Sequence, residues 1–115
     1  MYPLLKINQK KISDNTRAII KRTKKLGVAV TAVTKCTGGN LAIAQAFLDG
    51  VATAIGDSRI KNLKNLAPLA CEKWLIRVPM PSEVNHAVAY ATLSLNSEIT
   101  TIRLLNQAAK AQGKT

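Results

Sequence analysis

The stretch VAVTAVTKCTGGN, residues 28–40, decides how the rest of the chain is interpreted. Its first seven residues are small or β-branched, which is typical of a buried strand. The strand ends on Lys35, and Gly38 and Gly39 follow almost at once. A lysine at the end of a buried strand, beside glycines that let the backbone pass close to a ligand, raises the question of a binding site.

Strand-like and helical runs alternate on both sides of this stretch. The patterns predict strands at 3–8, 28–34, 51–56, 73–78 and 92–96, and helices at 9–26, 41–49, 58–67, 82–91 and 97–112. In the first helix the predicted apolar stripe consists of Ile12, Ile19, Ile20 and Leu26, and Gly27 ends the helix. Strands that alternate with helices predict a parallel sheet covered by helices, an α/β fold.

Two architectures fit this alternation: a small doubly wound sheet, or part of an eight-stranded βα barrel. The lengths of the units do not decide between them. The glycine fingerprint GxGxxG of a dinucleotide-binding fold is absent after the first strand. An intact barrel needs on the order of 250 residues. A chain of 115 residues would therefore supply an incomplete, half barrel.

Composition narrows the class of protein. Apolar residues make up 47% of the chain, but only 3% are aromatic, so we expect a core of Ala, Val, Ile and Leu. We find no apolar run long enough to span a membrane and no signal-peptide pattern. Cys36 and Cys71 lack the spacing of metal ligands or of a disulfide framework. We therefore expect a cytoplasmic protein without a metal site.

The net charge of +11 raises the question of a nucleic-acid partner. Much of the excess lies in the helix predicted at 9–26, where Asp14 is the only acid. We interpret this helix as a solvated basic face, with a polyanion-binding surface as the alternative. Its basic residues are Lys10, Lys11, Arg17, Lys21, Arg22, Lys24 and Lys25.

Polar side chains gather where the predicted strands end. In parallel α/β sheets and barrels this edge is where ligands bind. Each residue also has a structural interpretation: Asp57 and Asn96 can cap the helices that follow, and Arg59 can be a solvated side chain. Arg77 interrupts an apolar strand and needs an anion or a carbonyl as its partner.

Lys35 offers a different chemistry. A lysine at the mouth of a barrel can be partly desolvated, which favours the neutral, nucleophilic amine. Such an amine forms Schiff bases with aldehydes, including pyridoxal 5′-phosphate (PLP). Lysines after strands are common, so the residue type alone leaves this role open.

Five motifs in order resemble the N-terminal part of the alanine-racemase-type barrel proteins, in the branch of the ornithine and amino-acid racemases. They are YPLLKINQKKISDNTR, GVAVTAVTKCTGGN, AIGDSRIKNLKNL, LIRVPMPSEV and SLNSEITTIRLLNQAAKAQGK, which together cover nearly the whole chain. The strand-end lysine and GDSRIKNL are also similar to the related PLP-binding proteins without known enzymatic activity.

The resemblance implies a half TIM-type barrel of the alanine racemase N-terminal domain class over residues 1–115. It implies that Lys35 carries PLP as a Schiff base, and that Asp57, Arg59, Arg77 and Asn96 lie around the cofactor. The implied function is racemisation of a small-molecule amino acid, in which the cofactor delocalises the carbanion at the α-carbon. The lysine amine would then serve as acid and base on one face.

The sequence also departs from that family. The loop KCTGGN lacks the aromatic residue found in alanine racemases, and neither Tyr2 nor Tyr90 matches the tyrosine that acts on the second face. In the family the phosphate-binding backbone comes from later strands, so we expect a truncated fragment. Two alternatives stay open: a non-catalytic PLP-binding homeostasis protein, and a cofactor-free half barrel that self-associates into a homo-oligomer.

Overall fold

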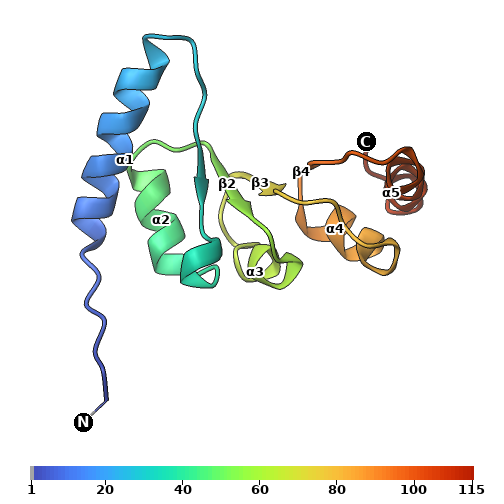
Figure 1. Ribbon diagram of the computed structural model, residues 1–115, viewed down its shortest axis with the longest axis horizontal. Helices are drawn as coiled ribbons and strands as arrows, with labels where there is room; N and C mark the ends of the chain where they lie inside the picture. The colour runs from blue at the N-terminus through green and yellow to red at the C-terminus, as the bar shows by residue number, and fades with distance from the viewer. Residues whose placement is uncertain (1) are drawn as a thin grey trace.

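A computed structural model describes residues 2–115 as a series of helices and short strands (Figure 1). The helices are α1 (Gln9–Lys24), α2 (Leu41–Asp49), α3 (Ile60–Asn65), α4 (Val84–Tyr90) and α5 (Ile99–Ala111). The strands are β1 (Thr31–Val33), β2 (Ala54–Asp57), β3 (Glu72–Leu75) and β4 (Leu93–Ser94). Two 3₁₀ turns, Lys35–Thr37 and Pro81–Glu83, follow β1 and precede α4. The alternation predicted from residue 9 onward is confirmed, although the strands are shorter than predicted.

The four strands form one parallel sheet in the order β1-β2-β3-β4. Neighbouring strands are in register through pairs such as Ala32 with Ile55 and Leu75 with Ser94. A doubly wound sheet reverses its strand order at a switch point, whereas a βα barrel adds each strand beside the last. The sequential order therefore selects the barrel-type architecture and excludes the doubly wound alternative.

Side-chain caps begin the first two helices where the sequence places an asparagine. The Asn8 side chain accepts a hydrogen bond from the backbone N–H of Lys11 at 3.0 Å, at the start of α1. Asn40 does the same for Ile43 at 3.1 Å, at the start of α2. Each cap satisfies a backbone donor that lacks a partner within the helix. The Asn40 cap fixes where the loop after β1 ends.

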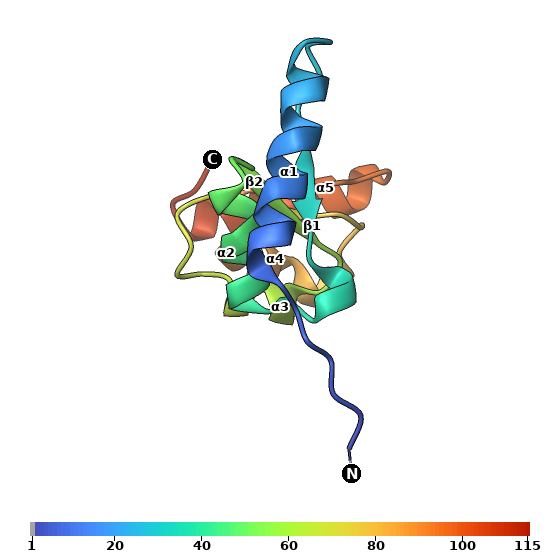
Figure 2. The same cartoon turned by 90° about the vertical axis from the view of Figure 1, so that its left-hand side faces the viewer.

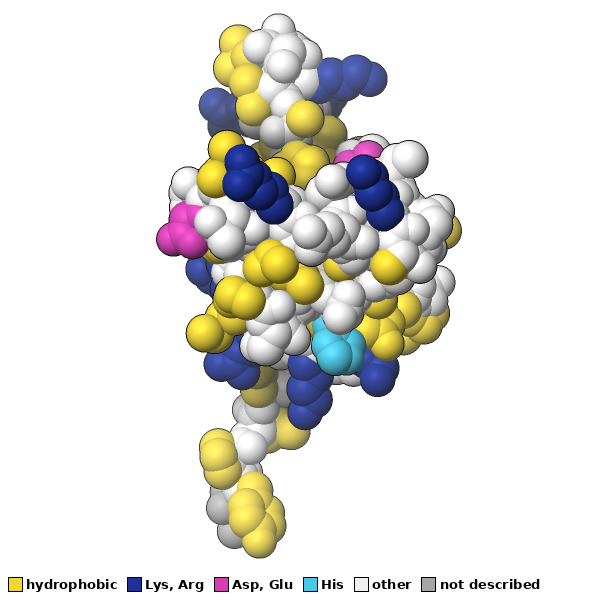
Figure 3. Space-filling view, turned by 90° about the vertical axis from the view of Figure 1, so that its right-hand side faces the viewer, with side chains coloured by type: hydrophobic (Ala, Val, Ile, Leu, Met, Phe, Trp, Pro, Cys, Tyr) yellow, Lys and Arg dark blue, Asp and Glu magenta, His cyan; other side chains and the backbone are white. Residues whose placement is uncertain are grey.

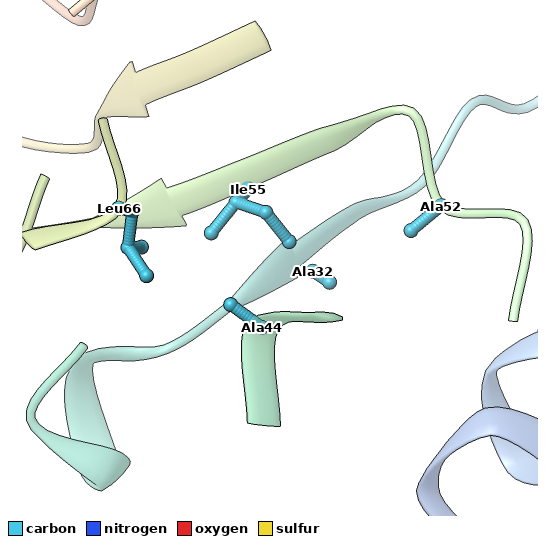
Figure 4. Packing of buried hydrophobic residues seen from close by; sticks show 5 residues of the cluster. All are labelled: Ala32, Ala44, Ala52, Ile55 and Leu66. Carbon is cyan, nitrogen blue, oxygen red and sulfur yellow. The ribbon is translucent and has the colours of Figure 1, made fainter. Parts of the chain in front are cut away.

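Small and branched side chains fill the space between the sheet and the helices. One cluster joins β1 and β2 to α2 and to the end of α3 (Figure 4). A second cluster, centred on Leu63, Leu75 and Ala87, joins β3 to α3 and α4. These clusters confirm the prediction of a core without large aromatic residues. The first consists of Ala32, Ala44, Ala52, Ile55 and Leu66.

The strand predicted at 3–8 is wrong. The segment runs away from the body of the molecule without joining the sheet (Figures 1 and 2). Its apolar side chains face solvent, with Leu4 78% and Leu5 82% exposed. An isolated strand leaves its backbone donors and acceptors unpaired, and no segment within residues 2–115 pairs with this one. Alternation alone could not reveal the missing neighbour.

The apolar stripe predicted for α1 is only partly correct. Ile12 and Ile20 are half-buried, but Ile19 and Leu26 are 54% and 79% exposed. The helix instead buries Thr16, where α2 ends at Gly50. A Cβ atom on Gly50 would lie 2.6 Å from the Thr16 Cβ, so α1 and α2 approach closely. The close contact between the two helices involves the side of α1 that carries Thr16, so Ile19 on another side of α1 remains in solvent.

The face of the sheet opposite the core clusters is open. A Cβ atom on Gly56 would meet Thr31 and Ile76 on this face, so their side chains lie beside each other there. Val33 and Leu93, which are in register with Gly56 and with Trp74 of β3, are 37% and 38% exposed. In a closed barrel this inner face is packed with side chains.

We also find no helix among residues 2–115 with the length and apolarity that a membrane crossing requires.

Candidate functional site

The turn that contains Lys35 follows β1 directly. The carbonyl oxygen of Thr34 accepts hydrogen bonds from the N–H and the Oγ1 of Thr37, both at 2.9 Å, and from the N–H of Gly39 at 3.3 Å. Gly38 and Gly39 both have left-handed backbones, with φ of +63° and +67°. The Lys35 side chain is exposed. The Lys35 side chain is therefore exposed to solvent, whereas the backbone of the turn that carries it is held by hydrogen bonds.

Asp57, at the end of β2, lies in a fully buried polar network. One oxygen of its carboxylate accepts from the Thr34 hydroxyl at 2.8 Å. The other accepts from the backbone N–H of Arg59 at 2.9 Å and from the Asn62 side chain at 3.0 Å. Three donors offset the cost of removing the carboxylate from water. These bonds give Asp57 a structural task, and its predicted contact with a cofactor stays a prediction.

Arg77, just beyond β3, has the carbonyl and anion partners that its position in an apolar segment demanded. Its Nε donates to the carbonyl of Ser58 at 2.6 Å, and Nη1 donates to that of Val78 at 3.1 Å. Two further donations at 2.8 Å form a bidentate ion pair with Glu83. The Glu83 carboxylate also accepts from the backbone N–H of Met80 at 2.9 Å. Arg77 thus ties the end of β2 to the turn before α4.

Arg59 and Asn96 behave differently from each other. Arg59 is exposed at the residue before α3, as its solvated interpretation predicted. The helix cap predicted for Asn96 is wrong, because its amide donates back to the carbonyl and hydroxyl of Ser94, at 3.1 and 2.9 Å. Its Oδ1 is the one buried side-chain polar atom without a partner that we find within residues 2–115. That oxygen can accept a hydrogen bond.

Two side-chain hydrogen bonds therefore connect the carboxyl ends of β1, β2 and β3. The Thr34 to Asp57 bond joins the first two strands, and the Arg77 to Ser58 bond joins the next two. Sequence reasoning singled out Gly39 but missed Thr34, Asn62 and Glu83. Only Glu83 left a signal, because a Glu two residues after Pro81 is typical of the first turn of a helix, where its carboxylate can accept from the N–H before that turn. The described residues contain no cluster of His, Cys, Asp or Glu suited to a metal ion.

No family model matches the sequence. A search of curated proteins finds the ornithine racemase of Acetoanaerobium sticklandii, which is 39% identical over 114 residues. That match covers 99% of this chain and includes each of the strand ends described above. The chain belongs to the alanine-racemase-type barrel proteins. The lysine racemase of Thermotoga maritima is 33% identical over 86 residues, 73% of this chain. The chain spans 32% and 24% of these relatives' lengths.

Solved structures confirm the fold of this alanine-racemase-type chain. The D-threonine aldolase of Filomicrobium marinum superposes on all of the chain with a TM-score of 0.81, at 16% sequence identity. The alanine racemase of E. faecalis matches 88% of it with a TM-score of 0.71, at 20% identity. The chain covers 32% and 28% of those structures. The parallel sheet is thus an incomplete barrel of the predicted class, and it corresponds to about a third of each of these solved structures.

The two glycines of the Lys35 turn give a first test of this geometry. A Cβ on Gly38 would meet no atom within 4 Å, so Gly38→Ala meets only the left-handed strain, about 1 kcal/mol. A Cβ on Gly39 would lie 2.6 Å from the Cβ of Asn62 and 2.9 Å from its Cα. Gly39→Ala should therefore lower the free energy of unfolding by about 2–4 kcal/mol. Urea denaturation measures both, and equal losses would contradict the close packing.

The pair of Arg77 and Glu83 gives a second test. Hydrogen bonds from the Arg77 guanidinium and then from Met80 N–H lower the pKa of the Glu83 carboxyl from 4.5 to about 2. A pKa that is lowered in the folded state stabilises the fold above the unfolded value, and this stabilisation disappears as the pH falls from 4.5 toward 2. The side chains are 34% and 33% exposed, so solvent screens part of the effect.

We expect Glu83→Gln to lower the free energy of unfolding by about 1–2 kcal/mol at neutral pH, after allowance for that screening. At about pH 3 the difference from the unmodified chain should shrink. Urea denaturation at the two pH values measures it. Glu98→Gln, which changes an exposed carboxylate before α5, is the matched control. A Glu83→Gln effect that is the same at both pH values would show that the ion pair contributes nothing.

Proposed function

We propose that this chain supplies the Schiff-base lysine of a PLP-dependent amino-acid racemase, and that Lys35 is that lysine. One observation carries the proposal: Lys35 stands at the carboxyl end of β1, in a chain that is 39% identical to an ornithine racemase over nearly its whole length. In barrels of this kind the catalytic groups lie at the carboxyl ends of the strands. Residues 1–115 would then be the N-terminal portion of the barrel domain of that racemase.

The residues present fit such a cofactor on the side of its aldehyde. Lys35 offers an exposed primary amine, and the backbone beside it carries glycines with open space at Gly38. The buried, unpartnered Oδ1 of Asn96, beyond β4, leaves an acceptor free at the same edge of the sheet. These features support attachment through Lys35. Asn96 and Arg59 stay proposed neighbours of the cofactor on the family resemblance alone.

When bound, PLP supplies an electron sink that makes the α-proton of an amino acid acidic. The contribution of this chain is local. The Lys35 amine would hold the cofactor, and once freed its Nζ would serve as the acid or base toward the α-carbon of the substrate on one face, with a second group needed on the opposite face. Both curated relatives are named as racemases of amino acids with a side-chain amine. We therefore propose a basic amino acid as the substrate. We also propose that the protein acts in the cytoplasm.

Borohydride trapping tests the role of Lys35. The 115-residue chain is mixed with PLP, reduced, and digested, and the modified lysines are identified by mass spectrometry. We expect the adduct chiefly on Lys35, because its backbone is fixed beside the proposed site. The other surface lysines have no such site to hold PLP next to them. Lys35→Arg keeps the charge and removes the primary amine, so its digest should lose that adduct alone. Labelling spread evenly over the lysines would overturn the proposal. If the adduct forms on Lys35, racemisation assays with ornithine and lysine separate an enzyme from a PLP-binding protein without activity.

A second observation favours self-association as well. The inner face exposes Val33, Leu93 and Leu95, the last at 48%, and β1 and β4 have no further strand beside them within residues 2–115. Apolar surface of this kind and open strand edges both favour association. We infer that a second copy of the chain covers this face when the chain is alone in solution. On the side of the molecule where α5 lies, Figure 3 shows hydrophobic side chains interspersed with polar ones.

Sedimentation velocity measures this association directly. We expect the unmodified chain to sediment as an oligomer, and Leu95→Glu to shift it toward the monomer because the substitution places a charge on the inner face. Ile19→Glu is the matched control, since Ile19 is 54% exposed on α1, away from the inner face. A monomeric unmodified chain, or equal effects of the two substitutions, would contradict the association of inner faces.

A further inference from the structure

We propose that Thr34 is the positioning residue of the Schiff-base lysine. Its hydroxyl ties the turn that holds Lys35 to the buried carboxylate of Asp57, and it thereby fixes the point from which the amine reaches into the mouth of the barrel. The inference rests on the proposed role of Lys35 and adds to it the device that controls where that amine can go.

All three polar groups of Thr34 are engaged, although the side chain is fully buried. Its N–H donates to the carbonyl of Gly56 at 3.0 Å, which continues the ladder between β1 and β2. Its hydroxyl donates to Asp57 at 2.8 Å, and its carbonyl accepts from Thr37 and Gly39. The residue is thus bound to β2 on one side and to the turn on the other. Lys35 is the next residue in the chain.

The anchor at the other end of this bond is itself immobile. Asp57 is fully buried and also accepts from Arg59 N–H and from the Asn62 side chain, at the start of α3. To swing away, the carboxylate would have to break three hydrogen bonds and leave their donors unpaired in the protein interior. The hydrogen bond from Thr34 therefore holds the turn to a rigid corner of the fold.

The same corner supports the far end of the turn. Gly39 lies so close to Asn62 that a Cβ atom would be 2.6 Å from the Asn62 Cβ, with a further contact to the Cα at 2.9 Å. Asn62 is 6% exposed and is held by Asp57. The turn is thus fastened at its entry through Thr34 and rests at its exit on the partner of the same carboxylate. Lys35 stands between the two points.

This fastening matters for the reaction because the lysine side chain is long and rotates freely. With a mobile backbone, Nζ would sweep a wide volume and seldom meet an aldehyde in a productive direction. With the backbone fixed, the amine is confined to the region within one side-chain length of the mouth, which raises its effective concentration there. Thr34 touches neither the aldehyde nor the substrate, and its effect passes through the position of Lys35.

Two substitutions at Thr34 separate its hydroxyl from its shape. Thr34→Val keeps the size and branching and removes the donor, whereas Thr34→Ser keeps the donor and removes a methyl group. Both are compared with the unmodified chain in two measurements: amide hydrogen exchange at residues 35–39, and the rate of the borohydride-trapped adduct at Lys35 relative to surface lysines. For Thr34→Val we expect amide exchange about tenfold faster and a Lys35 preference about tenfold lower, the factor that one lost hydrogen bond can produce.

Thr34→Ser should keep both values within about twofold of the unmodified chain, because its hydroxyl still reaches Asp57. Unchanged exchange and labelling in Thr34→Val would overturn the inference. Faster exchange throughout α2 and α5, or loss of the helical circular dichroism signal, would overturn it too, since Thr34 would then support the whole fold. If the unmodified chain forms no Lys35 adduct, the proposed function fails, and the exchange of residues 35–39 alone decides whether Thr34 holds the turn.

Discussion

The buried carboxylate of Asp57 is the interaction on which the edge of the sheet depends. It is fully buried, and the fold answers with the hydroxyl of Thr34 just after β1, an N–H from the loop after β2 and an amide from α3. These donors come from three separate elements, so satisfying one group fixes the relative positions of all three. Hydrophobic burial of alanines and leucines cannot supply such directional control, because it has no preferred angle.

The direction of that control explains why polar residues gather at the strand ends without all being ligands. Asp57 and Arg77 spend their hydrogen bonds on backbone and side chains of the protein. Lys35 and Arg59 remain exposed, and Asn96 keeps an oxygen without a partner. A working site needs both kinds of residue, because a freely moving reactive group is useful only on a backbone that other groups immobilise. The sequence pattern shows the two kinds mixed, and only the hydrogen bonds separate them.

Local chemistry is what made part of the structure predictable from the sequence. The Asn40 cap, the glycine turn after β1 and the alternation of strands and helices follow from properties of neighbouring residues. The strand predicted at 3–8 failed because pairing needs a partner that the segment does not contain. Thr34 and Asn62 escaped notice because a threonine in a strand and an asparagine in a helix are unremarkable until a buried carboxylate lies between them. Strand order, too, is a property of tertiary structure.

The two faces of the sheet differ in how far their side chains are buried, and the candidate site lies beside the exposed inner face. On the helix-covered side, Ile55, Leu63 and Leu75 are fully buried in the two core clusters. Val33 and Leu95 on the other side remain exposed next to the strand ends. Covering that face would remove water from the mouth where Lys35 stands, which strengthens every electrostatic interaction there. The hydrogen bonds around Asp57 are complete within this chain, so the backbone that carries Lys35 is fastened whether or not the inner face is covered.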